Sequence, residues 1–228
     1  MEDQFERTTR LIGPEAMQRL KGSRVAVFGI GGVGGACAEA LARAGVGAID
    51  LFDNDKVCLS NINRQAVALH STLGRYKADV MAERIADINP ECRVGAYKIF
   101  YMPDTAEEVD LAVYDCVVDA IDTVAGKIEL VVRAKAAGVR VVCAMGAANK
   151  MDPMGFVVTD IFRTETDPLA KAMRKELRAR GITDVKAVWS RETPSPSGSR
   201  GPLASNSFVP PACGLALASE AVRGLIEE

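Results

Sequence analysis

A glycine-rich stretch, G-I-G-G-V-G at residues 29–34, comes directly after the apolar run R-V-A-V-F at residues 24–28. An apolar run of this length that stops at glycine is typical of a strand buried on both faces. Alanine and leucine side chains then recur at helical spacing over residues 36–44, and a second apolar run follows at residues 48–52. The pattern predicts a strand, a tight glycine turn, a helix and a second strand, which together form a βαβ unit.

The same alternation of short apolar runs with helical patterns continues along the chain. Strands that alternate with helices favour an α/β fold of the Rossmann type, with a doubly wound and mostly parallel sheet and helices on both faces. After residue 146 the rhythm changes, and we expect the C-terminal third to add antiparallel strands to this sheet. Further strands are expected at residues 93–99, 116–120, 139–144, 155–159 and 186–190, and further helices at residues 74–88, 126–137, 168–180 and 212–226.

The composition favours a single globular domain spanning residues 1–228. Hydrophobic residues make up 48% of the chain and charged residues 25%, close to the average of soluble proteins. Within this domain we expect a nucleotide-binding core at about residues 22–146 and a C-terminal extension on the substrate side at about residues 147–228. Pro, Ser and Gly are frequent at residues 192–211, which predicts a mobile surface loop there.

Membrane insertion, secretion and zinc binding are each disfavoured by the residues that they need. No apolar run approaches the roughly 20 residues that span a bilayer, and the start M-E-D-Q lacks the basic and apolar segments of a signal peptide. The six cysteines stand singly, without a C-x-x-C pair, and the one histidine is His70. We therefore expect a cytoplasmic protein with reduced thiols and no zinc site.

The glycine stretch is a G-x-G-x-x-G fingerprint, and its place between a strand and a helix suits a nucleotide site. Glycine permits a tight turn and close approach of the backbone to phosphate, and the first turn of the helix offers unpaired N–H groups. Asp53 follows the second predicted strand, 24 residues after Gly29, where a carboxylate accepts hydrogen bonds from ribose hydroxyls. These features do not distinguish NAD from ATP, and a tight turn without a ligand is the other explanation of the glycines.

A polar cluster that starts at Asp53 favours ATP. Residues 53–65 read D-N-D-K-V-C-L-S-N-I-N-R-Q, and Lys77 follows. NAD presents only a pyrophosphate, whereas ATP presents three phosphates, onto which Arg64 can fork and toward which Lys77 can act as a point charge. The alternative is that Asn61 stands in a turn and that both cations are ordinary surface residues.

The stretch D-A-I-D at residues 119–122 ends a predicted strand on the ligand side of the sheet. Mg²⁺ prefers hard oxygen ligands that are shared among protein, water and phosphate. Asp122 lies beyond the apolar run and is the better candidate for this role. The other explanation is that Asp122 caps the helix that begins near Val124.

Taken together, these three motifs resemble the adenylating core of the ubiquitin-activating-like family, which includes bacterial enzymes that activate sulfur-carrier proteins. The resemblance covers residues 24–122 and implies an ATP site with Mg²⁺ at Asp122. The catalytic residues that it implies are Arg10, Arg64, Lys77 and Asp122. The nucleotide-binding residues that it implies are Gly29, Gly31, Gly32, Val33, Gly34, Asp53, Asp55, Asn61, Arg64, Lys77 and Asp122.

Arg10 lies outside those motifs, in the stretch R-T-T-R-L-I-G at residues 7–13. It resembles the arginine that members of this family extend across a homodimer into the active site of the partner. The resemblance therefore implies that the protein is a homodimer.

The second half of the chain resembles the branch of this family that acts on threonylcarbamoyladenosine in tRNA. The similar stretches are M-D-P at residues 151–153, V-T-D-I at residues 158–161 and D-P-L-A at residues 167–170. That branch uses ATP to activate a carboxylate on the modified adenosine as an acyl adenylate, and then closes a ring with loss of water. The implied partner is a tRNA that bears threonylcarbamoyladenosine. Whether a sulfur-transfer partner such as a cysteine desulfurase takes part is left open.

Three features of the second half have two explanations each. Residues 163–200 hold nine Lys or Arg and five acidic residues, which suits either contact with RNA phosphates or an ordinary solvated helix face. Cys213 begins the last predicted helix, where a thiol can become reactive, although packing in the core is the usual role of a free cysteine. Trp189 suits stacking on an RNA base or packing in the core.

Three other functions stay open from the sequence. An enzyme with the same core would adenylate the C-terminal glycine of a ubiquitin-like sulfur-carrier protein, although such activators typically carry two C-x-x-C pairs, which this sequence lacks. An NAD-dependent oxidoreductase would bind NAD without Mg²⁺. A non-catalytic nucleotide-binding partner protein would bind ATP without turnover.

Overall fold

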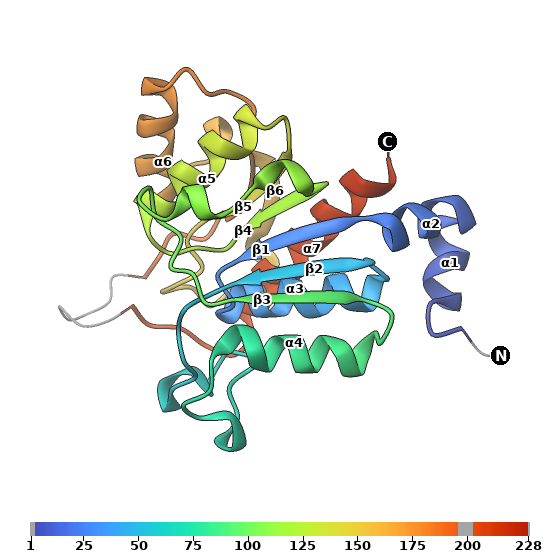
Figure 1. The fold of residues 1–228 in the computed structure, drawn as a ribbon. Helices are drawn as coiled ribbons and strands as arrows, with labels where there is room; N and C mark the ends of the chain where they lie inside the picture. The colour runs from blue at the N-terminus through green and yellow to red at the C-terminus, as the bar shows by residue number, and fades with distance from the viewer. Residues whose placement is uncertain (1–2, 196–202, 228) are drawn as a thin grey trace.

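A computed structural model of the chain describes residues 3–195 and 203–227. The strands are β1 Arg24–Phe28, β2 Ala48–Phe52, β3 Arg93–Tyr97, β4 Cys116–Asp119, β5 Arg140–Ala144, β6 Phe156–Asp160 and β7 Lys186–Ser190. They form one sheet in the order β3-β2-β1-β4-β5-β7-β6 (Figure 1). Neighbouring strands run parallel except β6, which is antiparallel to β7.

Helices cover both faces of this sheet. The α-helices are α1 Glu6–Ile12, α2 Pro14–Gly22, α3 Gly32–Ala44, α4 Lys77–Ile88, α5 Val124–Ala136, α6 Pro168–Ala179 and α7 Val209–Ile226. Helices α3, α4 and α7 pack on one face, around Leu41 and Met81, and helices α5 and α6 pack on the other, around Leu130 and Met173 (Figure 1). Burial of both faces explains why the central strands are mostly apolar, and the buried Asp50 of β2 is paired with Arg24 of β1 at 2.6 Å.

The chain reverses its direction of travel across the sheet between β1 and β4. It proceeds from β1 outward to β2 and β3, returns to β4 on the other side of β1, and continues to β5. The carboxyl ends of β1 and β4 therefore flank a crevice, because their following segments leave in opposite directions. Ligands of open α/β sheets bind at such a switch point.

The predicted fold class is confirmed, and several details differ from the prediction. β7 pairs in parallel with β5, so β6 is the one added strand that runs antiparallel. α7 begins at Val209 rather than at residue 212, because the first turn of a helix tolerates Pro210 and Pro211, which lack the N–H group. The predicted loop at 192–211 is therefore shorter at its C-terminal end, and residues 196–202 at its centre lie outside the described residues. Helices α1 and α2 were not predicted.

Packing in the core explains five of the six cysteines, all except the exposed Cys58, and the tryptophan. All six cysteines are free thiols. Burial of Cys213 raises its pKa to about 12, so this thiol is unreactive at neutral pH. Trp189 is 6% exposed within β7, where it packs in the core.

Among the helices of the described residues, none combines the length and the apolar character that crossing a membrane requires.

A buried ion pair joins α5 to the end of β4. The side chains of Lys127 and Asp119 are both fully buried, and Lys127 Nζ lies 2.9 Å from Asp119 Oδ2. The angle falls outside that of a hydrogen bond, so the contact is an ion pair. Asp119 Oδ1 also accepts a hydrogen bond from the Ile121 N–H, which fixes the turn that follows β4.

Replacing Lys127 with methionine is expected to lower the free energy of unfolding by roughly 3–5 kcal/mol, because Asp119 is left buried without its partner. Urea denaturation monitored by circular dichroism measures this loss. The double variant Lys127→Met/Asp119→Leu removes both charges and should regain a large part of it. Equal stability of the single and double variants would contradict the buried pair.

Candidate active site

The glycine stretch turns the chain sharply from β1 into α3. Gly29 has a backbone φ of 85°, and a Cβ there would come within 2.6 Å of the Ala120 carbonyl oxygen beyond β4. A Cβ on Gly34 would overlap the carbonyl oxygen of Gly29. Both positions therefore need glycine. The turn brings the amino end of α3 to the crevice, where its first N–H groups are available to an anion.

Asp53 follows β2 and ties this turn to the neighbouring strand. Its Oδ2 accepts a hydrogen bond of 2.6 Å from the Ile30 N–H, and its Oδ1 accepts one of 2.8 Å from the Asp55 N–H. Burial raises the pKa of Asp53, although the Lys77 charge and the two N–H donors act in the opposite direction. Each carboxylate oxygen keeps a second lone pair, so Asp53 can still accept hydrogen bonds from ribose hydroxyls.

Two cations reach the same edge of the sheet from different elements. Lys77 is the first residue of α4, and its buried Nζ lies 2.7 Å from Asp55 Oδ2. Arg64 is half-buried, and its guanidinium donates to the Ser60 carbonyl at 2.9 Å and to Asn63 Oδ1 at 2.8 Å. Neither of these partners is charged, so the Arg64 charge is available to a phosphate.

Asn61 and Asp122 differ in how they are held. Asn61 is 7% exposed, and its Oδ1 accepts a hydrogen bond from the Cys58 N–H, which fixes the loop that carries Arg64. Asp122 is exposed and has no hydrogen-bond or ion-pair partner among the described residues. Helix α5 has Thr123 at its N-cap position and no side-chain cap, so the capping explanation of Asp122 is wrong.

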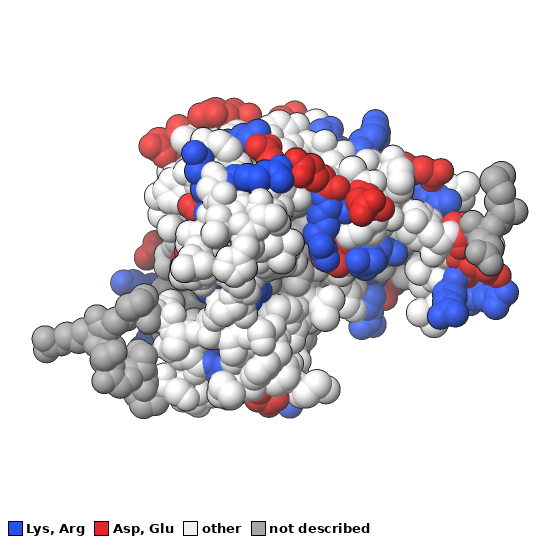
Figure 2. Space-filling view, turned by 90° about the horizontal axis from the view of Figure 1, so that it is seen from below, with Lys and Arg blue, Asp and Glu red and all other residues white. Residues whose placement is uncertain are grey.

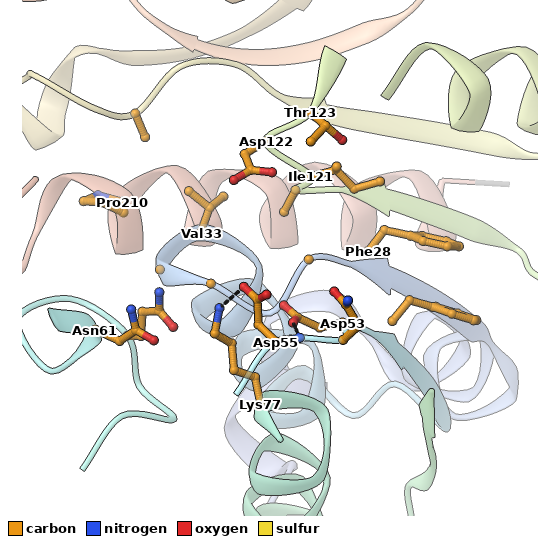
Figure 3. A pocket seen from close by; sticks show the side chains of 18 of the residues that line it. Phe28, Val33, Asp53, Asp55, Asn61, Lys77, Ile121, Asp122, Thr123 and Pro210 are labelled. Atoms are coloured by element: carbon orange, nitrogen blue, oxygen red, sulfur yellow. Dashed lines mark hydrogen bonds and ion pairs between the residues drawn. The ribbon is translucent and has the colours of Figure 1, made fainter. Parts of the chain in front are cut away.

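A cavity of about 660 Å³ lies between these elements. Figure 3 shows Asp122 on one side of it and Asp55 with Lys77 on the other. Gly34 packs behind the glycine turn and does not line the cavity, and Arg10 lies on α1, beyond the other end of β1 (Figure 1). The predicted residues that line the cavity are Gly29, Gly31, Gly32, Val33, Asp53, Asp55, Asn61, Arg64, Lys77 and Asp122.

Aromatic rings form a part of the cavity wall that the motif analysis missed. Phe28 and Phe52 stack with their centroids 4.3 Å apart and their planes 7° apart, and Tyr101 meets Phe28 edge-on at 4.8 Å. The three side chains are at most 3% exposed, so they form an apolar backing of the cavity rather than a free stacking surface. The available signal was position, because Phe28 and Phe52 are the last residues of β1 and β2, directly before Gly29 and Asp53.

Two further parts of the wall carried no role in the sequence analysis. Gln65 closes the polar motif, and its buried Oε1 has no hydrogen-bond partner in the described residues. Residues 147–148 after β5 and residues 203–205 before α7 also line the cavity, except Ala204. Small and uncharged residues such as these give no signal of a site in a sequence.

Comparison with known proteins identifies the family of the chain. A profile of the ThiF family matches residues 5–228, and the chain belongs to the ThiF family. The chain is 43% identical to tRNA threonylcarbamoyladenosine dehydratase of Bacillus subtilis (strain 168), over 99% of this chain and 95% of that protein. It is 32% identical to molybdopterin-synthase adenylyltransferase of Escherichia coli (strain K12), over 76% of this chain and 67% of that protein.

Solved structures agree with this assignment. The crystal structure of E. coli tRNA N6-threonylcarbamoyladenosine dehydratase in complex with AMP matches with a TM-score of 0.92 and 38% sequence identity, over 98% of this chain and 94% of that chain. The complex of the same protein with ATP matches over the same shares of both chains with a TM-score of 0.90 and 38% identity. The family resemblance stated from the motifs is confirmed.

Proposed function

We propose that the protein uses ATP to dehydrate N6-threonylcarbamoyladenosine in tRNA to its cyclic form. The observation that carries this proposal is the cavity at the switch point, where a glycine turn, a ribose-binding carboxylate and two cations meet. This arrangement supports binding of ATP, as in the E. coli dehydratase that was crystallised with it. The 43% identity to a dehydratase along nearly the whole chain supports the choice of tRNA as substrate.

The reaction has two steps, and the residues of the cavity match their needs. First, an oxygen of the threonyl carboxylate attacks the α-phosphorus of ATP, the bond from that phosphorus to the bridging oxygen breaks, and pyrophosphate leaves with the electron pair. Arg64 and Lys77 stabilise the negative charge that develops on the phosphate oxygens. Then a nitrogen or oxygen of the modification attacks the acyl carbon and loses its proton, and AMP leaves with the electron pair of the acyl–oxygen bond. No step needs a covalent bond to the protein.

The residues present fit a magnesium ion. Mg²⁺ is held in many ATP sites by one or two carboxylates together with substrate phosphates and water. Asp122 lines the cavity with its carboxylate unpartnered, as such a ligand requires, whereas Asp119 is committed to Lys127. Mg²⁺ would offset charge on the phosphates. The described residues contain no cluster of three His, Cys, Asp or Glu side chains that would hold a metal without substrate.

The proposal is tested by measuring the masses of the nucleosides in the tRNA after the reaction. Purified protein is incubated with Mg·ATP and tRNA that bears threonylcarbamoyladenosine, and mass spectrometry follows gentle digestion. We expect a nucleoside lighter by one water, formed only with ATP and lost when EDTA removes Mg²⁺. An unchanged nucleoside, with pyrophosphate exchange that depends on a carrier protein, would instead support the carrier-adenylating alternative. Tight binding of NAD that is indifferent to Mg²⁺ would support the oxidoreductase.

A homodimer with a shared active site is part of this proposal. Arg10 is exposed on α1, where its only described contact is an ion pair with Glu6; it does not line the cavity, and α1 lies at the opposite end of β1 from the glycine turn (Figure 1). Arg10 therefore acts in the cavity of a partner, in the way that the family resemblance implies.

Mixing two inactive variants tests the shared site. Arg10→Ala and Arg64→Ala are each expected to be inactive, because neither homodimer has a complete site. After equal amounts are mixed and allowed to exchange subunits, about a quarter of the sites combine both arginines, and about a quarter of the wild-type activity should return. A mixture that stays inactive although sedimentation shows exchanged dimers would refute the role of Arg10.

The contact surface for RNA stays a prediction. On the face shown in Figure 2, basic and acidic side chains alternate and a broad uncharged area lies to the left, so this face offers no continuous basic stripe to phosphates. The basic helix α6 lies on the opposite side of the molecule. If α6 contacts the backbone of tRNA, the double variant Lys171→Ala/Lys175→Ala should bind tRNA more weakly, and its binding should depend less on salt. A sulfur-transfer partner is equally a prediction, which co-purification with a cysteine desulfurase would test.

A further inference from the structure

One part of the cavity wall is built from two segments that lie far apart in the sequence. Ala147 and Ala148 follow the carboxyl end of β5, and Leu203 and Ser205 precede α7. None of these four residues is charged, whereas the glycine turn, Arg64 and Lys77 supply the groups that suit phosphates. The uncharged wall is therefore available to a second ligand in the same cavity.

Asparagine side chains fasten these two segments to each other. The Asn149 N–H donates to the Ala204 carbonyl at 2.8 Å, and the Ala204 N–H donates to Asn149 Oδ1 at 2.8 Å, so two hydrogen bonds close a ring. Asn149 has a φ of 59°, a conformation that asparagine adopts more readily than most residues. Asn206 Nδ2 adds a bond of 2.8 Å to the Lys150 carbonyl.

A third connection joins this wall to the loop that carries Arg64. Asn63 Nδ2 donates to the Ser205 carbonyl at 3.2 Å, and Arg64 in turn donates to Asn63 Oδ1. Ser205 is thus held between the segment after β5 and a phosphate-binding cation. A group bound at Ser205 lies next to the phosphate end of the cavity.

This wall presents hydrogen-bond donors that have no partner. Ser205 Oγ is buried and makes no hydrogen bond in the described part of the chain. The Gly146 N–H donates to Asp167 and the Asn149 N–H to Ala204, but the N–H groups of Ala147 and Ala148 between them have no acceptor among the described residues. A buried hydroxyl without a partner, such as that of Ser205, is costly unless a ligand supplies one, and the partly buried N–H groups of Ala147 and Ala148 are free to add to the same contact.

The chemistry of the donors indicates the class of the ligand. An ionised carboxylate is a pure acceptor with two oxygens, and it forms stronger hydrogen bonds with hydroxyl and N–H donors than a neutral acceptor does. Neutral donors hold a carboxylate in its ionised and nucleophilic form without placing a cation beside the attacking oxygen. Hydrogen bonds of this kind suit a carboxylate that must attack the phosphorus of a phosphate group bound by the nearby cations.

We propose that Ser205 Oγ and the N–H groups of Ala147 and Ala148 bind the substrate carboxylate that is activated, and that Asn149 positions Ser205. The inference rests on the proposed function, in which this carboxylate belongs to the threonyl group on adenosine. Ser205 is then a substrate-binding residue, and Asn149 is a positioning residue that acts through the segment 203–205.

Ser205→Ala tests the contact against a matched control, Ser207→Ala, which changes an exposed serine of the same segment. Steady-state kinetics measure kcat/KM for tRNA that bears threonylcarbamoyladenosine, and calorimetry measures ATP affinity without tRNA. Ser205→Ala should lower kcat/KM by roughly 10- to 100-fold, the usual effect of losing a hydrogen bond to a charged group. Its ATP affinity should stay within about twofold of that of Ser207→Ala.

Two replacements of Asn149 separate positioning from general stability. Asn149→Gly keeps the positive φ but removes the acceptor for the Ala204 N–H, and it should raise KM for tRNA while ATP affinity is unchanged. Asn149→Asp keeps the acceptor and should stay close to wild type. Thermal unfolding of each variant checks that the protein remains folded.

The outcomes distinguish this inference from the proposed function. If wild-type protein makes the cyclic nucleoside but Ser205→Ala matches Ser207→Ala in kcat/KM, the carboxylate site is refuted and the function stands. If Ser205→Ala loses ATP affinity in proportion to kcat/KM, Ser205 serves the nucleotide and the inference is again refuted. If wild-type protein makes no cyclic nucleoside, the proposed function fails and the inference fails with it.

Discussion

Replacing Arg64 with alanine is expected to lower kcat for dehydration by roughly 100- to 1,000-fold, which is the usual cost of removing one preorganised group that stabilises transition-state charge. The half-buried Arg64 side chain makes hydrogen bonds only to the uncharged groups of Ser60 and Asn63 among the described residues, so its loss should change the stability of the fold little. Single-turnover formation of the cyclic nucleoside at saturating ATP measures the effect on the chemical step.

Two further variants identify what Arg64 contributes. Arg64→Lys keeps the charge but cannot fork onto two phosphate oxygens, so an intermediate rate is expected. Arg75→Ala serves as the matched control, because Arg75 is an exposed arginine nearby in the chain whose ion pair is with Glu83 and which does not line the cavity. If Arg64→Ala turns over as fast as Arg75→Ala, then other groups neutralise the phosphates and the proposed role of Arg64 is wrong.

Much of the fold could be predicted because local residue patterns determine it. The mostly apolar runs at Arg24–Phe28 and Ala48–Phe52 are strands with the predicted bounds, since a strand buried on both faces requires mainly apolar residues. The polar residues after these strands meet in one cavity because parallel strands place their carboxyl ends at one edge of a sheet. Asp53 and Asp122 come together for this reason, although 69 positions separate them.

The rest depended on packing between distant segments. The direction of β7 is set by its pairing with β5 and β6, which its own residues do not encode. Ser205 lies in the cavity because hydrogen bonds from Asn149 and Asn63 hold its segment there, and these partners are 55 and 142 positions away from the residues that they bind. Contacts of this kind leave no periodic pattern in a sequence.

Gly34→Ala is expected to have the second large effect. Either the variant binds ATP at least 100-fold more weakly than wild type, or it does not yield soluble folded protein. The added methyl group would overlap the carbonyl oxygen of Gly29. That carbonyl cannot move aside freely, because Gly29 itself packs against the backbone of Ala120, in the turn that follows β4. Overpacking against backbone costs roughly 1–3 kcal/mol or more, and any relief must distort the turn that presents α3 to phosphate.

Gly35→Ala places the same methyl group one residue further along α3 and isolates the steric cause. Its Cβ would lie 3.4 Å from Met81 Cε, the flexible end of a side chain, so the methyl group fits with a small adjustment. Alanine also favours a helix more than glycine does, by about 1 kcal/mol. Thermal unfolding and calorimetric titration with ATP should therefore show Gly35→Ala close to wild type and Gly34→Ala strongly impaired. Similar behaviour of the two variants would mean that Gly34 does not pack as closely against the Gly29 carbonyl as the structure indicates, or that ATP binding does not depend on that close contact.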